Sequence, residues 1–195
     1  MRIPSLAVVL ASLTLGTSAW AADPVKGLPP APELPPPEAT YFVSEIRLGV
    51  FAHDPWSPEN GSADINGEIL SIKPFPGDSD LALAIPRLHL GGTVSTVGKT
   101  STLYGGFTWS LDLSPKVFLE ASLGGAFNNG STGVYVPVDR NALGCNWSFR
   151  ESASLGFRLT EQVSLMGTVE HYSNAGVCDR NRGLTNVGIR LGYSF

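Results

Sequence analysis

The sequence predicts an all-β protein, an eight-stranded antiparallel transmembrane β-barrel of a bacterial outer membrane. Three observations predict this fold. Only 15% of the 195 residues are charged although 22 are glycine, short segments with an alternating apolar and polar pattern recur, and tight turns alternate with longer polar loops. A soluble domain usually carries about 25% charged residues. Short turns at one end of the strands and long loops at the other are typical of outer-membrane barrels.

The first 40 residues predict two segments that precede the barrel. Arg2, the apolar stretch 3–15 and the small residues around position 20 predict a secretory signal peptide over residues 1–21. The apolar stretch is shorter than the about 20 residues that a transmembrane helix needs. Residues 22–40 hold seven of the fifteen prolines and predict an extended polyproline tail. This tail is either a passive spacer or a ligand for a proline-binding module.

Residues 41–195 contain eight segments with the period-two alternation of β-strands. Tight connections at 74–78, 114–115 and 160–161 alternate with longer polar loops. Pro86 interrupts the third segment, and because a closed barrel has no edge strand to accommodate a proline, it predicts a bulge or a later strand start. The predicted strands are residues 43–53, 63–72, 81–94, 102–111, 117–127, 146–157, 162–172 and 184–195, and the longer loops are 54–61, 128–145 and 173–183.

The last predicted strand indicates which face meets lipid. Every second residue from Thr185 to Phe195 lies on one face, and all of these residues except Thr185 are apolar. The residues between them lie on the other face, where Arg190 stands among small residues. In a transmembrane barrel the apolar set faces lipid and the polar set faces the lumen. The terminal Phe195 also resembles the C-terminal residue by which outer-membrane barrels are recognised for assembly. A secreted β-sandwich is the alternative fold.

Two polar residues break the lipid-facing pattern of the seventh strand. His171 and Ser173 share the parity of the apolar residues Leu165 and Val169. Polar side chains are disfavoured at the lipid boundary, so their presence there needs a reason. One interpretation is that the strand ends at Tyr172 and both residues lie in a wet loop. The other interpretation is that they carry chemistry.

A histidine and a serine at this spacing can form a nucleophilic pair. Residues i and i+2 of a strand lie about 7 Å apart on one face, so His171 could accept the proton of the Ser173 hydroxyl. The polar turn that follows contains Gly176 and Asn181, whose backbone amide and side-chain carboxamide are suitable donors to an oxyanion. A His-x-Ser sequence alone is common by chance, and the nearby oxyanion donors favour the interpretation that this one is catalytic.

The C-terminal part of the chain resembles the outer-membrane lipid A 3-O-deacylases, the PagL family. The resemblance implies an eight-stranded barrel with its catalytic groups on the outer wall. It implies a serine esterase that removes the 3-hydroxyacyl chain ester-linked at the 3-position of lipid A. It also implies Ser173 as nucleophile, His171 as general base, Gly176 and Asn181 as the oxyanion hole, and Asn174 in support. The motif covers His171-Tyr172-Ser173-Asn174-Ala175-Gly176, Asn181-Arg182-Gly183-Leu184 and the final strand to Phe195.

One position departs from the family pattern. The family acid that orients the histidine stands fourteen residues after it, and here Thr185 occupies that position. Thr185 can hydrogen-bond His171 but cannot stabilise an imidazolium by charge. A neutral third member weakens a triad without abolishing it. Glu170 has the inward parity, and Asp179 or Asn186 would reach the histidine only if the loop folds back.

The two cysteines predict a disulfide, in agreement with the oxidising compartment that the signal peptide implies. Cys145 lies just before the sixth predicted strand and Cys178 just after the seventh. Because the turn between these strands is near Thr160, both cysteines should reach similar heights at the long-loop end. The alternative is two buried free thiols.

The sequence also bounds the partners and the alternative functions. The expected partners are lipid A or lipopolysaccharide as substrate, outer-membrane lipid, and, as an option, a second copy in a homodimer. The net charge of −4 excludes nucleic acid as the main partner, because a phosphate binder needs a basic face. No metal or cofactor is expected, since His53, His89 and His171 are widely separated and lack ligand-like neighbours. The alternatives are a non-catalytic barrel (structural, or an adhesin presenting loop 128–145), an inactive relative, and a glycerophospholipid esterase.

Overall fold

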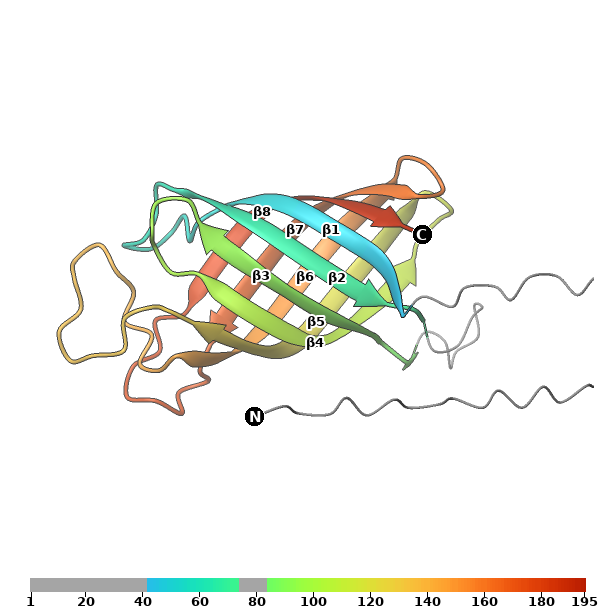
Figure 1. Cartoon of the computed structure of the whole chain (residues 1–195). Coiled ribbons are helices and arrows are strands. Elements are labelled where there is room, and N and C mark those ends of the chain that lie inside the picture. Colours follow the sequence, from blue (N-terminus) through green and yellow to red (C-terminus); the bar gives the residue numbers. More distant parts are fainter. Residues whose placement is uncertain (1–41, 74–83) are drawn as a thin grey trace, which may run out of the picture. The chain divides into compact units, whose positions relative to one another are not determined.

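The computed structural model describes residues 42–73 and 84–195, which form one closed barrel (Figure 1). Each strand pairs antiparallel with the next, and the last strand pairs with the first. The predicted fold class is confirmed. The predicted signal peptide (1–21), the proline-rich tail (22–40) and the turn at 74–78 lie outside the described residues. The strands are β1 (Val43–Ala52), β2 (Ala63–Ser71), β3 (Arg87–Ser95), β4 (Thr102–Asp112), β5 (Val117–Asn128), β6 (Trp147–Arg158), β7 (Val163–Ser173) and β8 (Leu184–Ser194).

Two strand boundaries differ from prediction in informative ways. β3 begins at Arg87, directly after Pro86. Residues 84–86 were predicted as part of this strand and do not belong to it. Proline has no N–H to donate to a ladder, and the strand therefore starts after it. β7 ends one residue later than predicted, because Ser173 still pairs with Phe149 of β6. The interpretation that His171 and Ser173 lie in a wet loop is therefore wrong.

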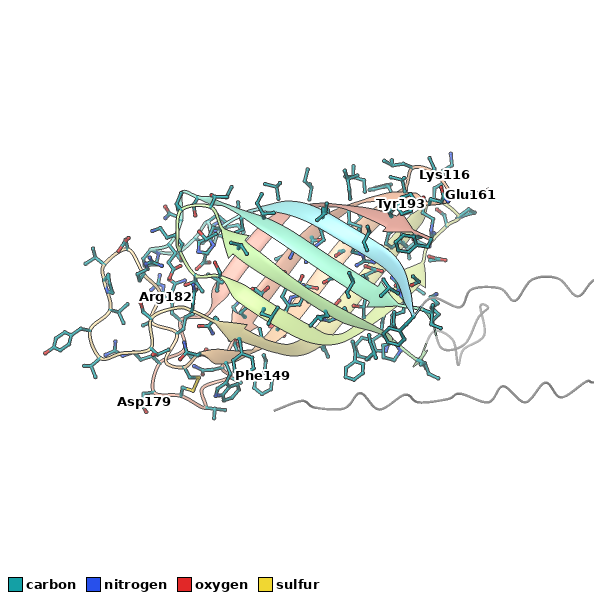
Figure 2. All side chains as sticks on the ribbon, viewed as in Figure 1. Lys116, Phe149, Glu161, Asp179, Arg182 and Tyr193 are labelled. Carbon is teal, nitrogen blue, oxygen red and sulfur yellow. A yellow bond between two sulfur atoms is a disulfide. The ribbon has the colours of Figure 1, made fainter. Side chains whose placement is uncertain are left out.

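The outer wall of the barrel is apolar, as the strand parity predicts. Leu48 on β1 and Ile189 on β8 are 67% and 61% exposed, and large apolar side chains project outward from every strand (Figure 2). Exposed apolar surface of this extent is not tolerated in water, whereas a lipid bilayer accommodates it. Residues 42–73 and 84–195 contain no helix that is long and apolar enough to cross a membrane.

The inside of the barrel is a packed network of ion pairs. Glu170 accepts hydrogen bonds from Arg150 at 2.9 Å and from Arg190 at 3.2 Å. Nearer the other end, Arg47 pairs with Glu120 at 2.7 Å. Removing one member of a buried pair leaves an uncompensated charge, which costs about 3–5 kcal/mol. The lumen therefore acts as a polar core that braces the wall from inside.

The two ends of the barrel differ in their connections. The longer loops gather at one end, where Figure 2 labels Asp179 and Arg182. The turns between β4 and β5 and between β6 and β7 are tight and lie at the opposite end, near Lys116 and Glu161. The alternation predicted from the sequence is thus present, and it places the C-terminal end of β7 at the long-loop end.

A buried hydrogen-bonded cluster ties the long loops together. His53, directly after β1, contacts Asp64 through Nδ1 at 2.7 Å and Glu59 through Nε2 at 3.0 Å. Glu59 also accepts hydrogen bonds from the backbone amides of Thr100 at 3.0 Å and Asn141 at 2.8 Å. One carboxylate therefore fixes three loops. We call these five residues the cap cluster.

The cap cluster should make the stability of the barrel depend on pH. Burial alone would lower the pKa of His53, but hydrogen bonds to Asp64 and Glu59 outweigh it and raise the pKa from 6.5 to about 9. Burial alone would raise the pKa of Glu59, but the His53 hydrogen bond and the two backbone amides lower it from 4.5 to about 2. The His53 contribution is therefore complete below pH 6.5 and is lost as the pH rises through 9. The Glu59 contribution is complete above pH 4.5 and is lost as the pH falls through 2.

We expect the midpoint of thermal unfolding to fall by several degrees when the pH is raised from 6.5 to above 9. The measurement is the heat-dependent shift in electrophoretic mobility of the barrel at each pH. The unfolding midpoint of the variant His53→Gln should fall less over this pH range, because glutamine has no charge to lose. An equal fall in the variant and in the unaltered protein would contradict the assignment.

Candidate active site

His171 and Ser173 lie on the outer face of β7, at the end of the strand that meets the long loops. Their neighbours Glu170 and Tyr172 point into the lumen and are buried, whereas His171 and Ser173 are half-buried on the outer wall. The register places His171 opposite Thr185 of β8 on one side and Glu151 of β6 on the other. Strand alternation alone therefore brings the two candidate catalytic side chains to the lipid-facing surface.

Thr185 holds the imidazole of His171. The Nδ1 atom of His171 lies 2.7 Å from the Thr185 hydroxyl oxygen, within hydrogen-bond distance. The Nε2 atom makes no hydrogen bond with the residues that the structure describes, and none joins His171 to Ser173. Catalytic hydrogen bonds of this kind often shorten only when substrate binds. The arrangement fixes one ring nitrogen and leaves the other available as a base.

Gly183 packs against the imidazole ring from the loop before β8. Its φ of +74° is in the left-handed region, and a Cβ atom there would lie 2.9 Å from the Cε1 atom of His171. Side chains essentially never approach so closely, so a larger residue would displace the ring. Glycine is therefore required here both by backbone conformation and by the space the histidine occupies.

The turn after Ser173 is organised by Asn174. Its side-chain NH2 donates to the carbonyl of Leu143 at 2.7 Å and also to the carbonyl of Arg180, and its backbone amide donates to Asn181 Oδ1 at 2.8 Å. Ala175 adopts a φ of +54° in this turn. A non-glycine residue in that region is uncommon and needs surrounding contacts to hold it. The contacts of Asn174 supply them.

The two candidate oxyanion donors are not equivalent in the structure. The Gly176 amide donates to Asn174 Oδ1 at 2.9 Å, so its hydrogen already has an acceptor. Asn181 accepts a hydrogen bond through its oxygen, which leaves its NH2 group without a partner among the described residues. Ser173 and Asn181 line the same small pocket of about 10 Å³. Asn181 is thus the better placed donor.

Cys145 and Cys178, the pair expected from the sequence, form a disulfide with a Cα–Cα distance of 6.2 Å. The bond connects the segment just before β6 with the loop between β7 and β8. This loop also carries the candidate oxyanion donors Gly176 and Asn181. The disulfide therefore anchors the turn beside Ser173 to the neighbouring loop.

Removing the disulfide should loosen this turn. The cysteines are 33 residues apart in sequence, and closing a loop of that length contributes about 3–4 kcal/mol in the chain-entropy model. We expect the variant Cys145→Ser with Cys178→Ser to unfold several degrees lower than the unaltered protein, as measured by electrophoretic mobility after heating. Reductant should lower the unfolding midpoint of the unaltered protein to that of the variant, and it should leave the midpoint of the variant unchanged. A midpoint that neither the variant nor reductant lowers would refute this role.

The other acidic or amide groups considered from the sequence do not reach the histidine. Glu170 is buried in the lumen and paired with two arginines. Asn186 also points inward, where its NH2 group donates to Glu170 at 3.2 Å. Asp179 lies exposed in the loop at the long-loop end (Figure 2). None of the three forms a hydrogen bond with His171.

Sequence reasoning missed two acidic residues close to the site. Glu151 stands directly opposite His171, and its charge on the lipid-facing parity of β6 was a signal that the sequence contains. Asp54 accepts a hydrogen bond from the Thr185 backbone amide at 3.1 Å. Asp54 and Thr185 are 131 residues apart, and they meet only because β1 pairs with β8. No local pattern in the sequence could indicate that contact.

An apolar groove on the outer wall begins at Ser173. Its volume is about 500 Å³, which is ample for part of an acyl chain. It crosses β4, β5 and β6 and is also lined by Gly124 and Arg150, which have the inward parity. The side chains that line it are Phe107, Leu123, Phe149, Glu151, Ser173 and Ala175. The site thus combines a candidate nucleophile with an adjacent apolar surface that faces lipid.

Comparisons with known proteins identify the family and the fold. A family model described as "Lipid A 3-O-deacylase (PagL)" matches residues 80–194, which include β3 to β8. The crystal structure of the outer membrane enzyme PagL is similar with a TM-score of 0.59 and 18% identity, and covers 78% of this chain and 100% of that chain. A structure from the de novo design of transmembrane β-barrels is similar with a TM-score of 0.51 and 15% identity, covering 79% and 96%. No curated protein matches the sequence.

Proposed function

Since this chain belongs to the lipid A 3-O-deacylase (PagL) family, we propose that it is an outer-membrane esterase that hydrolyses the 3-O-linked 3-hydroxyacyl chain of lipid A. The observation that carries the proposal is the position of His171 and Ser173 together on the lipid-facing wall, with one imidazole nitrogen held by Thr185. A polar pair at that boundary is costly unless it has a function.

The histidine acts as the base. With the Nδ1 hydrogen donated to Thr185, the Nε2 atom carries the free lone pair and accepts the Ser173 proton. The Ser173 oxygen attacks the acyl carbonyl carbon, and the tetrahedral intermediate collapses as the imidazolium protonates the leaving sugar oxygen. A water molecule, deprotonated by His171, then attacks the acyl-enzyme and releases the 3-hydroxy fatty acid.

The turn after β7 stabilises the oxyanion. The NH2 group of Asn181 is the main donor, because it has no other partner among the described residues. The Gly176 amide contributes by sharing its hydrogen between the oxyanion and Asn174 Oδ1. Loss of one such donor typically lowers kcat by about 10²–10³-fold. The role of Asn174 is to hold both donors in place.

The position of the site on the wall suits a substrate that never leaves the membrane. Lipid A reaches Ser173 by lateral diffusion, with its sugar at the long-loop end and its acyl chains along the barrel. The apolar groove of Phe107, Leu123 and Phe149 receives the chain that is cleaved. Burial of each methylene against such a surface contributes about 0.8 kcal/mol. Binding of the acyl chain therefore places the ester carbonyl beside the nucleophile.

We expect expression of the chain in the outer membrane to remove one 3-hydroxyacyl group from lipid A. Mass spectrometry of lipid A, with and without expression, measures this loss directly. An unchanged acyl pattern in cells that contain heat-modifiable, folded barrel would favour the non-catalytic alternative. Release of fatty acid from glycerophospholipid but not from lipid A in a purified assay would instead favour the phospholipid esterase.

A further inference from the structure

The third member of the candidate triad is a threonine, and a buried carboxylate lies directly behind it. Asp54 Oδ1 accepts the backbone N–H of Thr185 at 3.1 Å, and the Thr185 hydroxyl lies 2.7 Å from His171 Nδ1. Since the amide and hydroxyl of one threonine are about 3 Å apart, the carboxylate lies within about 9 Å of the imidazole. Asp54 is only 5% exposed.

The charge of Asp54 is compensated by neutral groups alone. Its second oxygen accepts from the side-chain NH2 of Asn141, and its backbone amide donates to Asn186 Oδ1 at 3.1 Å. Among the described residues no cation forms an ion pair with it. Its φ of +35° is unusual for a residue other than glycine. Strained backbone and an unpaired buried charge are both costly, and both persist only when surrounding structure enforces them.

We propose that Asp54 is the positioning acid of this active site, acting on His171 through Thr185. The carboxylate locks the Thr185 backbone, so that the hydroxyl stays against Nδ1. Its negative charge also favours the imidazolium that forms when His171 takes the serine proton. A buried charge at this distance is poorly screened by salt. This inference rests on the proposed function, because it assigns a role within that reaction.

Two other carboxylates near His171 are worse placed for this role. Glu170 is committed to Arg150 and Arg190 inside the lumen. Glu151 faces His171 from β6 but forms no hydrogen bond within the described part of the chain. The remaining nearby charge is Arg182, in the loop before β8. Asp54 alone is connected to the imidazole by hydrogen bonds.

The test is the pH profile of lipid A deacylation by purified, refolded barrel carrying Asp54→Asn. Asparagine tolerates the left-handed backbone and keeps an oxygen for the Thr185 amide, so the variant removes the charge together with the hydrogen bond from Asn141. We expect kcat to fall about tenfold. The acid limb of the profile should move to lower pH, because an anion that favoured the imidazolium is gone.

Matched variants separate this role from a structural one. Asp64→Asn removes a buried charge from the cap cluster, which adjoins Asp54 through Asn141, without contacting Thr185, so it should lower thermal stability but leave the acid limb in place. In a Thr185→Glu background, which restores an acid beside His171, Asp54→Asn should change kcat by less than about twofold. Thr185→Val provides an independent test that leaves Asp54 unaltered: it keeps the backbone amide that Asp54 accepts and removes the hydroxyl held against His171 Nδ1, so it should lower kcat at least as much as Asp54→Asn does.

Failure of the inference about Asp54 can be distinguished from failure of the proposed function. If the unaltered barrel does not deacylate lipid A, the proposed function is wrong. If it does, and folded Asp54→Asn keeps both kcat and the acid limb, the inference about Asp54 is wrong. That inference also fails if Asp54→Asn is equally harmful with threonine or glutamate at position 185, or if Thr185→Val keeps the kcat of the unaltered barrel.

Discussion

Replacing Ser173 with alanine should lower lipid A deacylation by at least about a thousandfold while the barrel remains folded. In the proposed mechanism the hydroxyl is the attacking group, and variants that lose the nucleophile of a serine esterase retain only what the oxyanion donors and substrate binding provide. The Ser173 hydroxyl forms no hydrogen bond with the described residues, so its removal costs the fold little. Lipid A mass spectrometry after incubation with purified protein measures the loss.

The control for this prediction is Ser152→Ala. Ser152 lies on β6 opposite Glu170, with the inward parity, and takes no part in the site. Its replacement should leave both deacylation and heat-modifiable mobility unchanged. If Ser173→Ala retained more than about a tenth of the unaltered activity, Ser173 would not be the nucleophile.

Replacing Gly183 with alanine should lower kcat about a hundredfold. The new Cβ atom would lie 2.9 Å from His171 Cε1 and 3.0 Å from the Tyr172 carbonyl oxygen. Because the carbonyl belongs to the strand backbone, the imidazole is the group that moves. A displacement of about 1 Å at a catalytic group can cost on the order of 10²-fold in rate. Substrate binding in the apolar groove should be almost unaffected, so the loss should appear in kcat more than in KM.

Gly98 supplies a matched control for backbone strain. It shares the φ of +74° with Gly183, but nothing lies within 4 Å of a Cβ built there. Gly98→Ala should therefore lower thermal stability about as much as Gly183→Ala and leave kcat unchanged. Equal kcat values for the two variants would show that Gly183 does not position the histidine.

The alternating pattern of apolar and polar residues predicts most of the fold, because successive side chains of a barrel strand face lipid and lumen in turn. The parity of β8 separates apolar residues from Arg190 and Asn186, and the structure places both of these in the lumen. Among the described residues, the largest difference lies at Pro86: residues 84 and 85 were predicted as strand, whereas β3 starts after the proline, which was the alternative that Pro86 itself indicated. Residues near the ends of strands are the least constrained by alternation.

The site was predictable only as far as its residues are local in sequence. His171, Ser173 and the turn through Asn181 lie within eleven positions, and Thr185 is set opposite His171 by strand register. Asp54 could not be found in this way, because its contact crosses the junction of the first and last strands. The partner of the Gly176 amide also depends on how Asn174 folds the turn, which no spacing rule specifies.

The junction between β1 and β8 has a consequence for when the protein can act. Asp54 follows one of these strands and Thr185 begins the other, so their hydrogen bond exists only after the chain has closed on itself. A chain that is exported but not yet closed would carry the serine and the histidine without the carboxylate behind them. With Asp54 in its proposed role, assembly of the barrel is a condition for full hydrolytic activity, and ester cleavage is delayed until the protein is seated among its lipids.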